Sequence, residues 1–111
     1  MPDPGPSYDP PRHVEHILDL YRQHPHTTGR VRKTDRLLAV DLFRQGIAID
    51  SVKVALLLVA ARRTQSPERQ HPHIRSLHYF LPAIREILDQ PLDNDYIRYL
   101  KRFTHRHHHL P

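Results

Sequence analysis

The segment V-K-V-A-L-L-L-V-A-A, residues 52–61, decides the fold of this chain. Drawn as a helix, it is apolar on every side, which is the pattern of a helix surrounded by other helices. Arg62 and Arg63 follow it, and the helix dipole favours cations at a C-terminal end. We therefore predict an all-α protein built around a buried central helix over residues 52–63.

The size and composition of the chain limit it to one core. It has 111 residues, with 11 prolines and only 3 glycines, so helices separated by proline-bearing corners are expected. There is no cysteine, which excludes disulfides, thiolate zinc sites and cysteine nucleophiles. No segment has the length and apolarity of a signal peptide or a membrane span, and we therefore expect a cytoplasmic protein.

The first helix is predicted to begin with Asp9 as its N-cap and Pro10 at its first position, where a missing N–H costs nothing. It should end near Gln23, before the next proline. Its inward stripe is formed by Val14, Ile17, Leu18 and Tyr21.

The second helix is predicted to begin after an N-cap at Thr27 or Thr28. It should end at Gly46, because glycine suits the left-handed conformation just past a helix end. Its inward residues are Val31, Leu38 and Leu42, flanked by Leu37, Val40 and Phe43.

The remaining helix boundaries are marked by acids and prolines. Asp50 is the expected N-cap of the central helix, with Ile49 and Val54 spaced as a hydrophobic staple around it. In the apolar stripe that follows, Pro82 either kinks one helix or begins a second one, and the sequence leaves both alternatives open. Asp93 is the expected N-cap of the last helix. The apolar stripe of that helix consists of Tyr96, Ile97, Leu100 and Phe103.

These elements predict one compact bundle of about five helices over residues 9–104. Residues 1–8, rich in proline, are expected to form a disordered lead-in. Residues 105–111 are expected to form a flexible, histidine-rich tail.

The formal net charge of +5 at pH 7 is the first indication of function, because excess Lys and Arg attract polyanions. Nucleic acid is the commonest polyanionic partner of such proteins. A basic surface that serves only solubility is the alternative. The 11 histidines would add positive charge as the pH falls toward 6.

A cluster of cations at the start of the predicted second helix is the first candidate site. The helix dipole disfavours cations there, whereas a bound phosphate would favour them, with free N–H groups and a small glycine beside it. The alternative is that these side chains only point into solvent. The candidate phosphate-binding residues are Thr28, Gly29, Arg30, Arg32, Lys33 and Arg36.

The last helix carries the second candidate site, where cations alternate with aromatic residues. Such a pattern can hold a nucleic-acid backbone while rings stack on unpaired bases. Tyr96, Leu100 and Phe103 share one face and are expected in the core, which leaves Tyr99 as the exposed ring. The candidate residues are Arg98, Tyr99, Lys101, Arg102 and Arg106.

Other chemistries find little support in the sequence. The central helix has no polar face and cannot serve as the recognition helix of a helix-turn-helix. The histidines of loop 64–73 and of the tail lack an orienting second shell, so no metal site is expected. No glycine-rich phosphate loop or nucleophile motif occurs, and we expect neither an enzyme nor a bound cofactor.

Three segments carry a resemblance to a known family. They are the turn and helix G-I-x-x-D-x-V-x-x-A-L at 46–56, the segment I-R-S-L-H-Y-F at 74–80, and Tyr96-Ile97-x-x-Leu100-x-x-Phe103. Together they resemble the helical C-terminal region of bacterial replication-initiation and helicase-loader proteins of the DnaD type. The resemblance implies an accessory protein of DNA replication or of a mobile element, which contacts DNA and another replication protein.

The sequence therefore predicts a small basic nucleic-acid-binding accessory protein that acts mainly through phosphate contacts, with DNA as the expected partner. The alternative is an adaptor whose basic surface docks on an acidic partner protein. No small-molecule substrate and no membrane partner are indicated.

Overall fold

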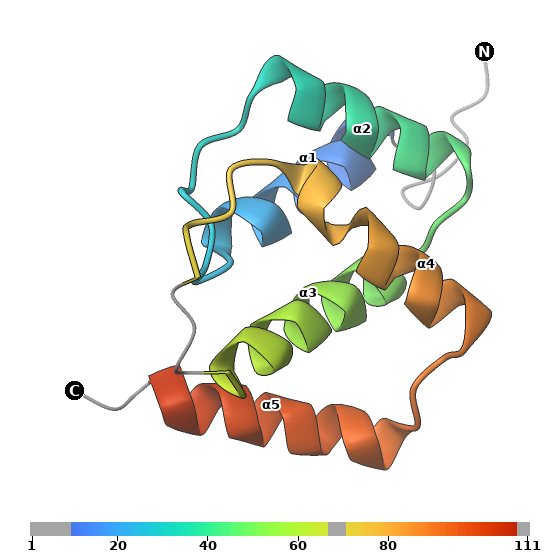
Figure 1. Cartoon of the computed structure of the whole chain (residues 1–111). Coiled ribbons are helices and arrows are strands. Elements are labelled where there is room, and N and C mark those ends of the chain that lie inside the picture. Colours follow the sequence, from blue (N-terminus) through green and yellow to red (C-terminus); the bar gives the residue numbers. More distant parts are fainter. Residues whose placement is uncertain (1–9, 67–70, 109–111) are drawn as a thin grey trace.

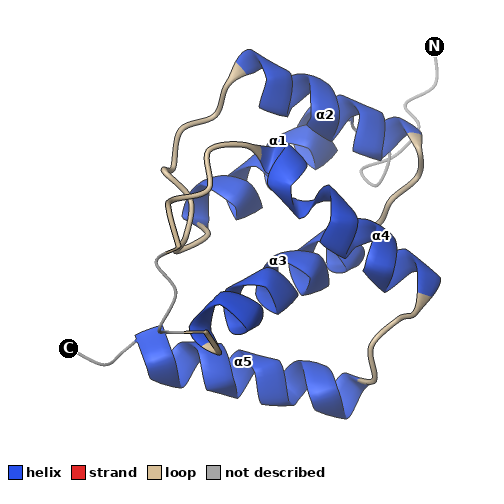
Figure 2. Cartoon of the chain, in the orientation of Figure 1, coloured by secondary structure: helices blue, strands red, loops and turns tan. Residues whose placement is uncertain are grey.

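The computed structural model describes residues 10–66 and 71–108, with side chains for 12–66 and 71–105. Within these ranges the protein is all-α, as predicted, and an isolated parallel bridge between Thr27 and Ile74 is the nearest approach to a strand (Figure 2). None of the described helices is long and apolar enough to cross a membrane. The elements are α1 (Pro10–Gln23), α2 (Lys33–Arg44), α3 (Ile49–Thr64), the 3₁₀ turn η2 (Leu77–Phe80), α4 (Leu81–Asp89) and α5 (Asn94–His108).

The helix α3 lies between the others and packs against α1, α4 and α5 (Figure 1). Its buried apolar residues are Val52, Ala55, Leu56, Leu58, Val59, Ala60 and Ala61. Each buried Leu or Val contributes about 1.5–3 kcal/mol, so this helix is the main source of hydrophobic stabilisation. The predicted burial of the central helix is confirmed with one correction. Leu57, expected to be mostly buried, is only partly covered, because the gap between α3 and α5 is open beside it.

The helix α2 ends just before Gly46, as predicted, and a turn then leads to α3. Gly46 has a φ of +75°, the left-handed conformation that favours glycine. Its N–H donates to the carbonyl of Phe43 at 3.0 Å, and the N–H of Ile47 donates to the carbonyl of Leu42 at 3.1 Å. This pair of bonds is the Schellman motif, which satisfies carbonyls at the helix end.

The predicted start of α3 is wrong by two positions. Ala48 is the N-cap, and Asp50 lies inside the first turn without making a side-chain cap. The positions of a hydrophobic staple therefore belong to Ile47 and Val52, both buried in the core, and not to Ile49 and Val54.

The starts of α4 and α5 are set by residues next to them in the chain. Pro82 lies in the first turn of α4, directly after η2, so it begins a helix instead of kinking one. Asp93 caps α5 as predicted, since its Oδ1 accepts from the N–H of Asp95 at 3.4 Å. The helix α5 continues past residue 104 to His108, so part of the predicted tail is helical. The lead-in 1–8, Asp9 and residues 109–111 lie outside the described residues.

A buried arginine at the end of α3 joins the two long loops. The side chain of Arg63 is only 6% exposed. Its Nε donates to Nδ1 of His26 and one terminal nitrogen donates to the hydroxyl of Tyr79, both at 3.2 Å, while the other donates to the carbonyl of Pro72. Since these partners come from separate segments, Arg63 fixes the loop after α1 and the loop before η2 to the C-terminal end of α3.

Substitutions at two adjacent leucines test this account of α3. Leu56→Asp should prevent folding, because a buried carboxylate costs several kcal/mol against a total stability of about 5–15 kcal/mol. Leu57→Asp should fold with a lowered melting temperature, because a charge at the open gap stays hydrated. Thermal melts followed by far-ultraviolet circular dichroism measure both variants. Equal loss of structure in the two would contradict the placement of Leu57.

Candidate nucleic-acid interface

The predicted phosphate site around Gly29 does not lie at a helix start. The helix α2 begins at Lys33, and Thr28, Gly29 and Arg30 belong to the preceding loop, where Gly29 has a φ of +78°. The N–H of Thr28 donates to the carbonyl of Ile74 at 3.0 Å. Those of Gly29 and Arg30 donate to threonine hydroxyls at 3.3 Å. The expected N-cap at Thr27 or Thr28 is therefore wrong, and the N–H groups expected to hold a phosphate are used within the chain.

The start of α2 is occupied by a carboxylate of the protein itself. Asp35 is fully buried, and its Oδ2 accepts from the N–H of Arg32 at 2.8 Å. Its Oδ1 accepts from the N–H of Leu77 at 2.9 Å, so one carboxylate joins the starts of α2 and η2. An acid in the first turn is what the helix dipole favours. Sequence reasoning missed this role because only the distant η2 shows that Asp35 is buried.

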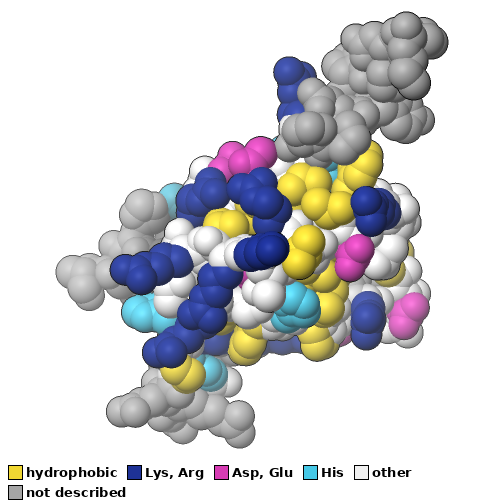
Figure 3. Space-filling view, turned by 90° about the horizontal axis from the view of Figure 1, so that it is seen from above, with side chains coloured by type: hydrophobic (Ala, Val, Ile, Leu, Met, Phe, Trp, Pro, Cys, Tyr) yellow, Lys and Arg dark blue, Asp and Glu magenta, His cyan; other side chains and the backbone are white. Residues whose placement is uncertain are grey.

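The cations near α2 remain on the surface. Arg30, Arg32 and Lys33 are exposed, and Arg36 pairs with Glu15 on α1 at 3.1 Å. Figure 3 shows a band of Lys and Arg side chains over one half of the face that α2 crosses. This surface can attract a polyanion over a distance, although it lacks the predicted helix-start clamp. Val31, predicted to lie inside a helix, is a partly buried loop residue, and Leu37 on α2 is exposed.

The helix α5 carries a row of three aromatic rings, of which two are exposed to solvent. Leu100 and Thr104 face the core, whereas Tyr99 is 47% exposed, which confirms it as the outward ring. Tyr96, expected in the core, is 43% exposed, so that prediction is wrong. The reason is that α5 is covered mainly on the side that contacts α3. Phe103, also expected in the core, is partly buried and packs against it. The ring centroids of Tyr96 and Tyr99 lie 6.0 Å apart, and those of Tyr99 and Phe103 lie 6.1 Å apart, with nearly parallel planes. These three residues are called the ring row below.

The predicted cations of α5 divide between its two edges. Arg98 and Arg102 are exposed and lie next to the ring row by helical spacing. Arg98 pairs weakly with Asp95 at 3.6 Å, where both side chains are more than two-thirds exposed. Lys101 lies at the other edge, where it lines a pocket. The side chain of Arg106 lies outside the described residues.

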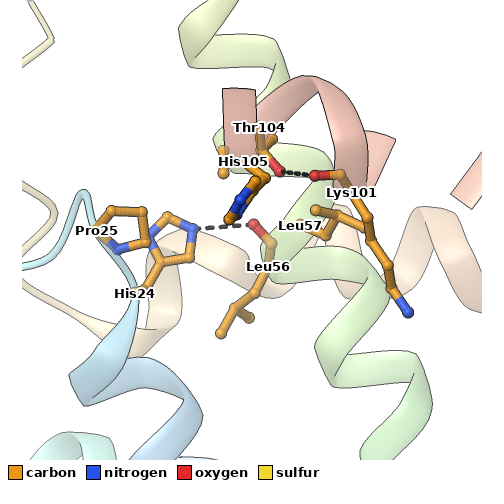
Figure 4. A pocket seen from close by; sticks show the side chains of 8 residues that line it. His24, Pro25, Leu56, Leu57, Lys101, Thr104 and His105 are labelled. Carbon is orange, nitrogen blue, oxygen red and sulfur yellow. Dashed lines mark hydrogen bonds between the residues drawn. The ribbon is translucent and has the colours of Figure 1, made fainter. Parts of the chain in front are cut away.

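The pocket beside Lys101 lies between α3, α5 and the end of α1 and has a volume of about 360 Å³. Figure 4 shows His24 from the loop after α1, and His105 from α5, close to the backbone of Leu56. The Nε2 of His24 lies 2.9 Å from the carbonyl of Leu56, and its Nδ1 accepts from the N–H of His26 at 3.1 Å. These partners fix His24 as the neutral Nε2–H form. His24 therefore has a structural role, which no spacing in the sequence indicates.

The two predicted sites are not brought together. The helix α2 lies at the top of Figure 1 and α5 at the bottom, with α3 between them. The residues around Gly29 and those of α5 are therefore separate surfaces.

Comparisons of the chain with protein-family models, with curated proteins and with solved structures found no match. The resemblance to DnaD-type proteins therefore stays a prediction. Among the residues with described side chains, no three histidine or acidic side chains come together as metal ligands. The geometry of the surface is therefore the basis for a proposed function.

The role of Asp35 can be tested by stability. Asp35→Ala should lower the free energy of unfolding by about 2–4 kcal/mol, because it leaves the buried N–H of Leu77 and the partly buried N–H of Arg32 without their acceptor. Urea denaturation measures the change. Asp41→Ala is the matched control, since Asp41 is an exposed acid of the same helix and should cost less than about 0.5 kcal/mol. Equal effects in the two variants would contradict the account.

The stability of the fold should depend on pH through Tyr21. Its hydroxyl is buried and forms no hydrogen bond of regular geometry with a described residue. Burial raises the pKa of Tyr21 above its usual value near 10, and the nearby Asp35 raises it further, against smaller opposing effects of Arg32 and Thr28. Above that pH the unfolded chain loses a proton that the folded chain keeps, so stability should fall as the pH rises. Urea denaturation at several alkaline pH values should show a smaller fall for Tyr21→Phe than for the wild type. Tyr99→Phe, at an exposed ring, should keep the wild-type fall, and identical pH dependence of all three proteins would contradict the prediction.

Proposed function

We propose that the protein binds single-stranded nucleic acid along the outer face of α5. The supporting observation is the ring row of Tyr96, Tyr99 and Phe103 beside the exposed Arg98 and Arg102. Aromatic rings stack on unpaired bases at about 1–3 kcal/mol per base, and arginines pair with the phosphates between them. A duplex hides the faces of its bases, so single strands should be preferred.

The outer face of α5 is accessible to a ligand because the helix is held to the core by its inner face. Leu100 is fully buried against the core and Thr104 bonds back to the carbonyl of Leu100 at 2.9 Å, so the inner side of α5 is fixed. On the outer side Tyr96 and Tyr99 are exposed, whereas Phe103 is partly buried against the core. The ion pair of Arg98 with Asp95 is exposed and contributes at most about 1 kcal/mol, so a phosphate can replace Asp95.

The charge of the whole chain supports the same proposal. A net charge of +5 draws a polyanion toward the protein, and the band of cations on the α2 face adds to this field. That contribution acts mainly on the association rate and weakens with salt. Of the two predicted surfaces, α5 is the one proposed to make specific contacts.

Binding of a fluorescent oligothymidylate, followed by anisotropy at several salt concentrations, tests the proposal. Tyr99→Ala should weaken binding by about tenfold, the loss of one stacked base. The double change Arg98→Gln and Arg102→Gln should flatten the slope of log affinity against log salt by about 1.4, because each phosphate contact to a single strand contributes about 0.7.

The matched control removes the same charge from the other end of the molecule. Arg32→Gln with Lys33→Gln should keep a slope close to that of the wild type, and its melting temperature should be unchanged or raised. A flattened slope in this control, with no effect of the α5 changes, would place the interface on the α2 face. An adaptor for an acidic protein would bind none of the oligonucleotides even at low salt.

A further inference from the structure

A second pocket lies between α3 and α4 and has a volume of about 460 Å³, within the range of small-ligand sites. Apolar side chains of both helices form part of its wall. Its polar lining consists of Arg62, Arg63, His78, Tyr79 and Glu86. Donors outnumber acceptors in this set, since only Glu86 carries a negative charge.

One of the side chains that line the pocket is a buried cation. Arg63 is 6% exposed, and its hydrogen bonds go to a neutral imidazole, a phenol and a backbone carbonyl. No acidic side chain of the described residues forms an ion pair with it. Buried charges are normally paired, so a negative group in the pocket would be favoured. A guanidinium has five N–H donors, so not all of them are used by these partners.

Tyr79 adds a donor beside Arg63. Its oxygen accepts from Arg63, and the phenol proton can therefore be donated to a ligand. The guanidinium carbon of Arg63 lies 5.6 Å from the centre of the Tyr79 ring, which holds the two groups together. Both donors therefore lie side by side in the lining of the pocket.

Arg62 and Glu86 form the rim. Two nitrogens of Arg62 donate to the two carboxylate oxygens of Glu86 at 2.9 and 2.5 Å. Both side chains are about half exposed, 54% and 46%, so water competes for this pair and it can open. The pKa of Arg62 is raised, mainly by its hydrogen bond to Glu86. The helix α3, which carries Arg62 and Arg63, packs against both α4 and α5, so the pocket and the ring row lie on neighbouring elements of the fold.

We propose that this pocket binds a phosphate monoester, held by Arg63, Tyr79 and a released Arg62. A monoester carries close to two negative charges and three acceptor oxygens, which matches these donors better than the single charge of a phosphodiester. Resting on the function proposed above, the monoester in the complex is the terminal phosphate of a strand whose bases stack on the ring row.

Three internally labelled oligothymidylates test the proposal, one with a 5′-phosphate, one with a 3′-phosphate and one with neither. The wild type should bind one phosphorylated strand about tenfold more tightly than the unphosphorylated strand. Arg62→Gln should abolish this preference, whereas Glu86→Gln should increase it, because the competing carboxylate is removed. Arg85→Gln and Asp89→Asn are matched controls, since they make the same charge changes at exposed positions of α4 outside the pocket. Both controls should keep the wild-type preference.

The outcomes separate the pocket from the proposed function. Equal affinity of the wild type for all three strands would overturn the pocket and leave single-strand binding intact. If no strand binds, inorganic phosphate and phenyl phosphate are titrated into ¹⁵N-labelled protein. Shifts of the amides around Arg63 and Tyr79 that disappear in Arg62→Gln would support a site for a free phosphate compound. Absence of such shifts would overturn the pocket as well.

Discussion

The rest of the structure depends on the need to surround a helix that is apolar on nearly every side. The helix α3 can be stable in water only if other helices cover it, and α1, α4 and α5 each pack against it. Each covering helix turns one face inward, and its other face stays in solvent. Because α5 is covered mainly by α3, the rings of Tyr96 and Tyr99 remain exposed beside Arg98 and Arg102. The proposed interface is thus a consequence of how the core is covered.

Two buried charged side chains hold the loops and helix starts that the apolar core does not position. Arg63 attaches both long loops to the end of α3, and Asp35 joins the start of α2 to η2. Both use backbone and neutral side-chain partners, as buried charges require. Asp35 and Arg63 have opposite effects on the binding of an anion. Asp35 occupies the helix start that a phosphate would need, whereas Arg63 carries a charge that no acid of the described residues neutralises and that faces a pocket.

Features governed by neighbours in the chain could be predicted from the sequence. The end of α2 at Gly46, the cap at Asp93 and the inward stripe of α1 are of this kind, because a turn or a helical repeat determines them locally. The start of α2 could not be predicted, because Asp35 is held by Leu77, 42 positions away. The burial of Arg63 likewise depends on His26, 37 positions away. Tyr96 was misplaced because an apolar stripe on a helix does not show how much of it a neighbouring helix covers.

The central claim is that nucleic acid contacts α5 and not the loop around Gly29. The most direct measurement is a titration of ¹⁵N-labelled protein with a short single strand, followed by the chemical shifts of the backbone amides. The account predicts that the largest changes occur in residues 95–103, while residues 28–36 change little. Changes confined to residues 28–36, or no change at a low salt concentration, would contradict it.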